Sequence, residues 1–382
     1  QQQVNLSRRL AIFSLSNGKT LLWTIPLICF FLILLIPLNK LEMNPTQMYS
    51  EKYTSFGPDV LWLDKKLGAS FPISFKATSD NGSVSNPRFL EDLDNFSMWL
   101  EEQKEVTHVT SLARTMKSLN KSMHGDDLKM KVIPEDQELS SQYLFFYEMS
   151  LPMGLDLNTS ISQDRGSTRI AATLREMTSK EYLVFDEKVT KYLRENNLES
   201  NISKPAGFRV IFVYLMEAIV NSLLFGVTIG LALIIIVIGL FFRSASFGFL
   251  SSFPNILPIV SAFGVWAIID GQIDFMVAVG MGSTLGIIVD FTVHLLSKYD
   301  LARQELKKSP EDAVLFAFEA VGFALIAMTV ILTLGFSVLH LNSFLPMHNF
   351  AQFSILAFVF ALIIDFFLFP NLLIRFDKRK FD

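Results

Sequence analysis

Residues 282–294 read GSTLGIIVDFTVH and lie inside an otherwise apolar segment that spans residues 275–297. Asp290 falls 15 positions after Phe275, which places it about 22 Å along a helix. A carboxylate at such a depth in a membrane costs at least a few kcal/mol, and residues of this kind usually face a bundle interior and serve ion or proton pathways. The stretch therefore predicts a membrane helix that carries a proton-binding carboxyl at Asp290.

The neighbours of Asp290 predict which way it points. Gly282, Gly286, Asp290 and His294 are spaced by four residues, so they stack along one helix face. Small residues at this spacing let a second helix approach closely, so Asp290 is expected to face a packed helix in a low dielectric. The His294 imidazole titrates near neutral pH and could extend a proton path; simple hydration near the end of the segment is the alternative.

Five other segments are apolar over the roughly 20 residues that a membrane-crossing helix requires. They are residues 21–38, 211–242, 245–269, 320–347 and 350–374. Together with 275–297 they form one span, a long polar stretch and then five spans. The predicted fold is a membrane α-helical bundle of six transmembrane helices, arranged 1+5, with an inserted extracytoplasmic domain.

The positions of Lys and Arg in the short loops predict the orientation, because such residues concentrate on the cytoplasmic side. They precede the first span, occupy the turn at Arg243, link the fourth and fifth spans and close the chain. Both termini are therefore expected to be cytoplasmic, in the inner membrane of the cell. The predicted divisions are 1–20 (cytoplasmic), 21–38 (first helix), 39–210 (extracytoplasmic), 211–375 (five-helix bundle) and 376–382 (cytoplasmic tail).

The 39–210 region is predicted to be α/β. Strand-like alternation occurs at residues 71–77, 106–112, 168–174 and 202–206, and helical patterns occur at 88–104, 134–147 and 180–195. Strands and helices that alternate at this spacing are typical of split βαβ units, which make up the ferredoxin-like fold.

Three further residues are candidates for the relay or for helix packing. Thr329 and Thr333 lie one turn apart in the fifth span, and Gly322 lies seven residues before Thr329. The two hydroxyls could extend a relay, although bonding to their own i−4 carbonyls is an equal alternative. Asp365 lies about ten residues before the final basic cluster, so a structural or interfacial role is expected for it.

Several classes of function are excluded or left without a signal. No GxxxxGK[ST], nucleophile elbow or HExxH is present, so neither ATP hydrolysis nor an enzymatic role is expected. The single cysteine, Cys29, cannot form a disulfide framework or a thiolate metal cluster. No cofactor or metal is predicted, and a net charge of −4 gives no sign of nucleic-acid binding.

The chain resembles the C-terminal half of an exporter of the resistance-nodulation-division (RND) superfamily, in its MMPL-like (hydrophobe/amphiphile) branch. Residues 282–294 are similar to the Gly-rich Asp-Tyr helix of that family. Other similar stretches are EAVG (319–322), Thr329, TLGF (333–336), SFLPM (343–347) and ALIID (361–365) through Pro370. One departure is Phe291, which stands where many members carry Tyr.

The resemblance implies half of a proton-driven exporter of lipids or other amphiphiles, with porter-type subdomains and a relay between the fourth helices of two halves. Its partners would be the other six-helix half, in the same or a separate polypeptide, a lipid or amphiphile substrate, the membrane and a periplasmic carrier protein. The chain begins Gln1-Gln2-Gln3 without Met, so we expect a piece of a longer polypeptide. A sterol-sensing receptor and a SecDF-like helper of protein export are the alternatives.

Overall fold

A computed structural model describes residues 2–41, 48, 58–59, 62, 66, 72–152, 154–175, 177–377 and 379. The chain divides into two compact units. The first, which we call the membrane unit, comprises Gln1–Met43, Met48–Thr54 and Met216–Asp382, and the second, the α/β unit, comprises Asn44–Gln47 and Ser55–Leu215.

Within the described residues, six helical segments are long and apolar enough to cross a membrane. They are Gly18–Leu38, Phe208–Phe241, Ala245–Ile269, Phe275–Gln304, Pro310–Leu341 and Leu345–Phe376. They match the six predicted spans in number and order, so the prediction of a largely helical protein with six candidate spans is confirmed. The side of the membrane on which each end lies stays a prediction.

Helix α1 (Gln2–Ser16) precedes the first segment. The first four segments are α2 (Gly18–Leu35) with the turn η1 (Ile36–Leu38), then α8 (Phe208–Phe241), α9 (Ala245–Ile269) and α10 (Phe275–Gln304). The fifth segment is composite and consists of α11 (Pro310–Ala317), the π-helical turn η5 (Phe318–Gly322), α12 (Phe323–Ser337) and η6 (Val338–Leu341). The sixth consists of α13 (Leu345–Phe367) and α14 (Phe369–Phe376).

The fifth segment begins at Pro310 rather than at residue 320 as predicted. Ser309 caps it, because its hydroxyl accepts a hydrogen bond from the Asp312 backbone N–H at 3.1 Å, and Pro310 occupies the favoured first turn. The acidic first turn, with Glu311 and Asp312, suits the positive end of the helix dipole. Because this first turn is polar, the apolar pattern alone does not predict it.

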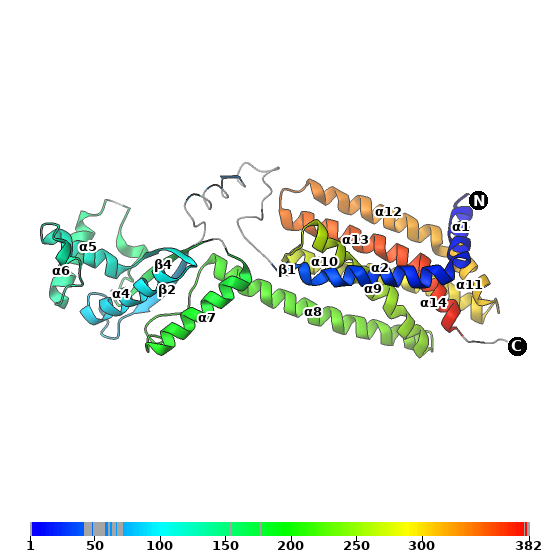
Figure 1. The fold of residues 1–382 in the computed structure, drawn as a ribbon, viewed down its shortest axis with the longest axis horizontal. Helices are drawn as coiled ribbons and strands as arrows, with labels where there is room; N and C mark the ends of the chain where they lie inside the picture. Colours follow the sequence, from blue (N-terminus) through cyan, green and yellow to red (C-terminus); the bar gives the residue numbers. More distant parts are fainter. Residues whose placement is uncertain are drawn as a thin grey trace. The chain divides into compact units, whose positions relative to one another are not determined.

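Helices α9, α10 and α13 lie side by side in the centre of the membrane unit (Figure 1). Their shared core includes Trp266, Phe291 and Phe353, which are fully buried. The ring of Phe353 lies 4.6 Å from that of Phe263 and 6.4 Å from that of Trp266, measured between centroids. These contacts hold α9 against α13, and α10 fills the remaining side.

Helix α2 packs against α9 at Gly264. A Cβ placed at this position would collide with the backbone carbonyl oxygen of Leu32. The end of α2 is then tied to the start of α10 by a two-residue parallel ladder, in which β1 (Lys40–Leu41) pairs with β5 (Gln272–Ile273). Glycine at residue 264 therefore sets how closely α2 can approach the bundle.

The α/β unit contains the strands β2 (Ile73–Thr78), β3 (Val106–Thr110) and β4 (Ser167–Leu174), in the order β2-β4-β3 and all antiparallel. Residue 71 of the predicted first strand lies outside the described residues. The predicted strand at 202–206 is present as two isolated antiparallel bridges, Ala77 with Ile202 and Ser74 with Ala206. These bridges lie on the edge of β2 that faces away from β4.

The helices of this unit are α4 (Pro87–Glu102), α5 (Leu112–Met123), α6 (Gln137–Ser150) and α7 (Ser179–Glu195), with short turns η3 (Leu128–Met130) and η4 (Leu157–Thr159). The start of α7 is fixed by a capping box between Thr178 and Glu181. Helix α5 was not predicted, because its first residue was read as the end of a strand. Phe96 of α4 packs edge-on against Phe75 of β2, with ring centroids 5.2 Å apart.

We predict that Gly264→Ala destabilises the membrane unit by about 2 kcal/mol, because α2 must move away from α9 to admit the new methyl group. Thermal unfolding of the full chain in detergent, followed by tryptophan fluorescence, measures the loss. Gly230→Ala is the matched control, since among the described residues no atom beyond its own helix backbone and chain neighbours lies within 4 Å of a Cβ at that position. Equal melting temperatures for the two variants would contradict the close contact.

Candidate functional site

Helix α10 carries polar side chains on two different faces. On the first, Nε2 of His294 lies 3.3 Å from Oδ1 of Asp290, as an i, i+4 pair on one helix face. The Asp290 side chain is 49% exposed and that of His294 is 53% exposed. Both side chains are therefore about half exposed in the described part of the chain. The sequence predicted that a packed helix covers Asp290, and no helix of the described chain does so.

The two glycines expected to pack against a helix lie on the same face. A Cβ at Gly286 would meet nothing within 4 Å, and one at Gly282 would touch only Leu223 and Val227 of α8, each at 4.0 Å. Gly286, Asp290 and His294 thus form an uncovered face of α10, by which we mean these three residues from here on. Their roles in packing and in a relay stay predictions.

The opposite face of α10 holds a buried polar cluster that the sequence did not reveal. Oγ1 of Thr292 lies 3.1 Å from Oδ1 of Asp365 on α13 and 3.3 Å from Oδ1 of Asn255 on α9. All three residues are completely buried. Side chains two residues apart on an α-helix point in directions that differ by about 200°. Thr292 and Asp290 therefore point to opposite sides of α10.

The buried cluster changes the interpretation of Asp365. Its distance from the basic end of the chain predicted a structural or interfacial role; the structure buries its side chain completely, which argues against the interfacial alternative and leaves the structural one. Oδ2 of Asp365 has no hydrogen-bond partner among the described residues. A polar atom buried without a partner costs free energy, so Asp365 requires a physical explanation.

The remaining predicted site residues form no hydrogen bond with either group in the described part of the chain. Thr329 is buried and donates to its own i−4 carbonyl, that of Leu325, at 2.9 Å, which is the alternative weighed from the sequence. Oγ1 of Thr333 has no hydrogen-bond partner in the described part of the chain. Gly322 packs against α1, since a Cβ there would lie 3.0 Å from Cβ of Ser7.

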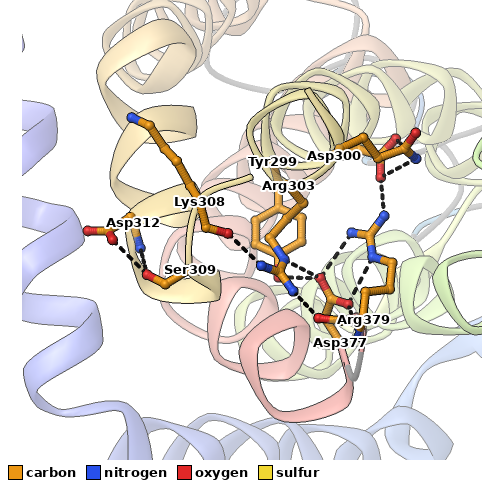
Figure 2. A network of polar contacts seen from close by, with 9 residues as sticks. Tyr299, Asp300, Arg303, Lys308, Ser309, Asp312, Asp377 and Arg379 are labelled. Carbon is orange, nitrogen blue, oxygen red and sulfur yellow. Dashed lines mark hydrogen bonds and ion pairs between the residues drawn. The ribbon is translucent and has the colours of Figure 1, made fainter. Parts of the chain in front are cut away.

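A polar network fixes the C-terminal end of α10 (Figure 2). Oδ2 of Asp377 accepts hydrogen bonds from Arg303 Nε and from the Tyr299 hydroxyl, both at 2.9 Å. Arg379 donates to both oxygens of Asp377 and, at 2.6 Å, to Asp300. Burial alone raises the pKa of Asp377, but the hydrogen bonds from Arg379 and Arg303 outweigh it and hold that pKa well below its usual range.

The N-terminal end of α10 is fixed by Asp274. Its Oδ1 accepts from the backbone N–H groups of Met276 and Val277 at 2.8 and 2.9 Å, as an N-cap. Its Oδ2 accepts from Nδ2 of Asn349, near the start of α13, at 2.9 Å. Burial raises the pKa of Asp274 against the effect of these hydrogen bonds. Helix α10 is therefore held at both ends, and its polar residues lie between the anchors.

Metal binding has no support in this part of the molecule. Within the described residues, no group of three or more His, Cys, Asp or Glu side chains is placed to hold a metal ion. The polar groups of α10 can exchange protons and form hydrogen bonds, and that is the chemistry that the arrangement offers.

Comparison with known proteins gives a coarse answer. No protein-family model matches the chain. The chain is 29% identical over 160 residues to MJ1562 of Methanocaldococcus jannaschii. The name of that protein assigns it to the membrane proteins. The match covers 41% of this chain and only 40% of that protein. With the six apolar helices, this similarity supports a multi-pass membrane protein.

We predict that Asp377→Asn lowers the stability of the membrane unit by about 3 kcal/mol at neutral pH, because the carboxylate charge that accepts the hydrogen bonds of Arg303 and Arg379 is lost. A carboxyl with a depressed folded-state pKa contributes stability above its unfolded pKa, near 4, and loses it as the pH falls further. The difference in melting temperature should therefore shrink between about pH 4 and the lowest tolerated pH.

Glu305→Gln, near the same end of α10, is the control, because the described structure shows no ion pair at this side chain. It should melt like the wild-type chain at every pH. A difference between Asp377→Asn and the wild type that is independent of pH would show that the carboxylate charge is not what stabilises the network.

Proposed function

We propose that the chain is one half of a proton-driven transporter of the RND type, MMPL-like branch, that moves lipids or other amphiphiles. The observation that supports it most is the pair Asp290 and His294, midway along α10 on a face that the described part of the chain does not cover. A second six-helix half, from the same polypeptide or a separate one, would cover this face.

The chemistry of the pair suits such a role. A charged carboxylate enclosed between helices is costly, and a protonated one is much less so. Proton uptake at Asp290 therefore favours close packing of a partner helix on Gly286, and proton release favours separation of the two. His294, 3.3 Å away, can accept or supply the proton through a ring nitrogen. A proton gradient would in this way drive a cycle of helix packing.

The α/β unit is consistent with a porter-type domain. Across the sheet, β2 lies between the last strand-like segment (202–206) and β4, and β3 lies beyond β4. This order, with α4 after the first strand and α7 after the third, supports a ferredoxin-like βαββαβ unit. The unit departs from that pattern because α5 and α6 lie between the second and third strands. We propose that this unit lies outside the inner membrane, that both termini are cytoplasmic and that a periplasmic carrier takes up the substrate.

Phe291 modifies the proposed relay. It stands where many members of the resembled family carry Tyr, and its side chain is completely buried in the core of the membrane unit. It therefore does not belong to the uncovered face, and a proton relay in this chain would use Asp290 and His294 without an adjacent phenol.

Two other functions remain as alternatives. A sterol-sensing receptor would share the helix arrangement but needs no proton-binding carboxyl at residue 290. A SecDF-like helper of protein export would be expected to have a smaller domain than residues 39–210 form. The half-exposed acid in the middle of α10 favours the transporter.

We predict that Asp290→Asn, in the complete transporter reconstituted in vesicles, reduces proton-driven lipid efflux to the level of protein-free vesicles. The amide cannot cycle through a charged state, yet it keeps the size of the side chain. Expression and melting temperature should stay at wild-type values because the residue is half exposed. Asp300→Asn, in the network at the end of α10, is a control that should retain proton coupling. Wild-type efflux in Asp290→Asn would exclude Asp290 from the mechanism.

We also predict that Gly286→Leu lowers efflux at least tenfold while it leaves the melting temperature of the isolated chain unchanged. Among the described residues outside its own helix backbone, no atom lies within 4 Å of a Cβ at this residue, so the larger side chain is expected to act mainly on a partner helix. Gly226→Leu on α8, which is equally open, is the matched control and should retain efflux. Normal efflux in Gly286→Leu would argue against a partner on the uncovered face.

A further inference from the structure

We propose that Asp365 is a proton-binding site of the membrane unit and that its carboxyl carries a proton in the conformation described. The inference concerns the buried cluster of Asp365, Thr292 and Asn255 and does not depend on the proposed transport function. It rests on the hydrogen-bonding capacity of three completely buried side chains from α13, α10 and α9.

An ionised Asp365 would leave the cluster short of donors. The Thr292 hydroxyl has one proton, and three acceptors lie around it, namely Oδ1 of Asp365 at 3.1 Å, Oδ1 of Asn255 at 3.3 Å and the carbonyl of Ile288 at 3.4 Å. The amide of Asn255 donates elsewhere, to the carbonyl of Ser251 at 2.7 Å. If the Asp365 carboxylate were charged, the single proton of the Thr292 hydroxyl would therefore be the only donor available in this cluster to Asp365, Asn255 and the Ile288 carbonyl.

One added proton removes this shortage. A protonated Asp365 donates from Oδ1 to the Thr292 hydroxyl oxygen, and the Thr292 proton is then free for Oδ1 of Asn255. Asn255 in turn donates to Ser251, so the hydrogen bonds run in one direction from α13 through α10 to α9. Oδ2 of Asp365, which has no partner among the described residues, becomes a neutral carbonyl oxygen, whose burial costs far less than that of a charged one.

No cation in the described part of the chain offers an alternative neutralisation, since Asp365 forms no ion pair there. Helices α9 and α12, which pack around α13, contain no Asp, Glu, Lys, Arg or His. On the other neighbours and on α13 itself the titratable or charged side chains are Lys19 and Cys29 of α2, Arg8 and Arg9 of α1, Glu319 of η5 (paired with Arg8), Arg375 of α14, His340 of η6, His348 of α13, and Asp290, His294, Lys298, Tyr299, Asp300 and Arg303 of α10.

Of these groups, Asp290 and His294 lie near Thr292 in the sequence but on the other side of α10. Cys29 belongs to the apolar cluster around Ile364 and Leu368, and Arg303 is engaged with Asp377. The proton on Asp365 is thus enclosed by the chain's own helices, whereas the Asp290 carboxyl is half exposed. Exchange of the Asp365 proton requires α9, α10 and α13 to separate enough to admit water.

Infrared spectroscopy of the full chain in lipid membranes tests the proposal, because a protonated carboxyl and a carboxylate absorb at different frequencies. At neutral pH, the spectrum of the wild type minus that of Asp365→Asn should contain the carbonyl band of one protonated carboxyl. Asp290→Asn is the matched control and should retain this band. If Asp365→Asn instead loses carboxylate bands, the residue is ionised and the proposal is wrong.

Asp365→Asn is expected to fold, because the amide supplies the donor that the acidic proton provides. Should it fail to fold, Thr292→Val answers the same question. The protonated-carboxyl band of the wild type must then persist but move to higher frequency, because its hydrogen bond to Thr292 is lost. A spectrum of Thr292→Val that matches the wild type in this region would overturn the proposal.

Discussion

A carboxyl group enclosed by apolar helices has no water with which to share its charge, and the membrane unit is arranged around this constraint. Helix α13 presents one acid, Asp365, to the interior of the bundle, and helix α10 presents another, Asp290, to the outside of it. Within the described chain, Asp365 is hydrogen-bonded to a hydroxyl and, through that hydroxyl, linked to an amide. The other acid, Asp290, pairs with a histidine and remains half exposed.

The two faces of α10 therefore differ in what covers them. The face with Thr292 is covered by α9 and α13 of the same chain, so it belongs to the packed core of α9, α10 and α13. The face with Gly286, Asp290 and His294 has room that nothing in the described chain fills, so it is available to a partner. A charge change at Asp290 therefore acts at the edge of the unit, where it need not disrupt the core.

The helices could be predicted from the sequence because membrane crossing imposes a length and an apolar composition that each segment must satisfy alone. The start of the fifth segment could not, since its first turn is polar and depends on the cap at Ser309. In the α/β unit, the pattern predicted the sheet, but α5 was missed because its small apolar face is short and follows a strand directly.

The buried cluster was beyond the sequence for a different reason. Asn255, Thr292 and Asp365 are separated by 37 and 73 positions, and each is unremarkable in its own segment. Only the packing of α9, α10 and α13 brings them together. The depth of Asp365 was estimated from its distance to the basic end of the chain, which ignores how tightly the neighbouring helices enclose it. The face of α10 that carries Asp290, by contrast, follows from the four-residue spacing alone.

The anchors of α10 limit the kinds of motion that it can undergo. Asp274 and the β1–β5 ladder hold its beginning, and the arginines around Asp377 hold its end. A helix clamped in this way cannot travel along its axis like a piston without breaking one of the clamps. A change in charge near the middle of α10 would instead rotate or slightly bend the helix, while its two anchored ends stay in place.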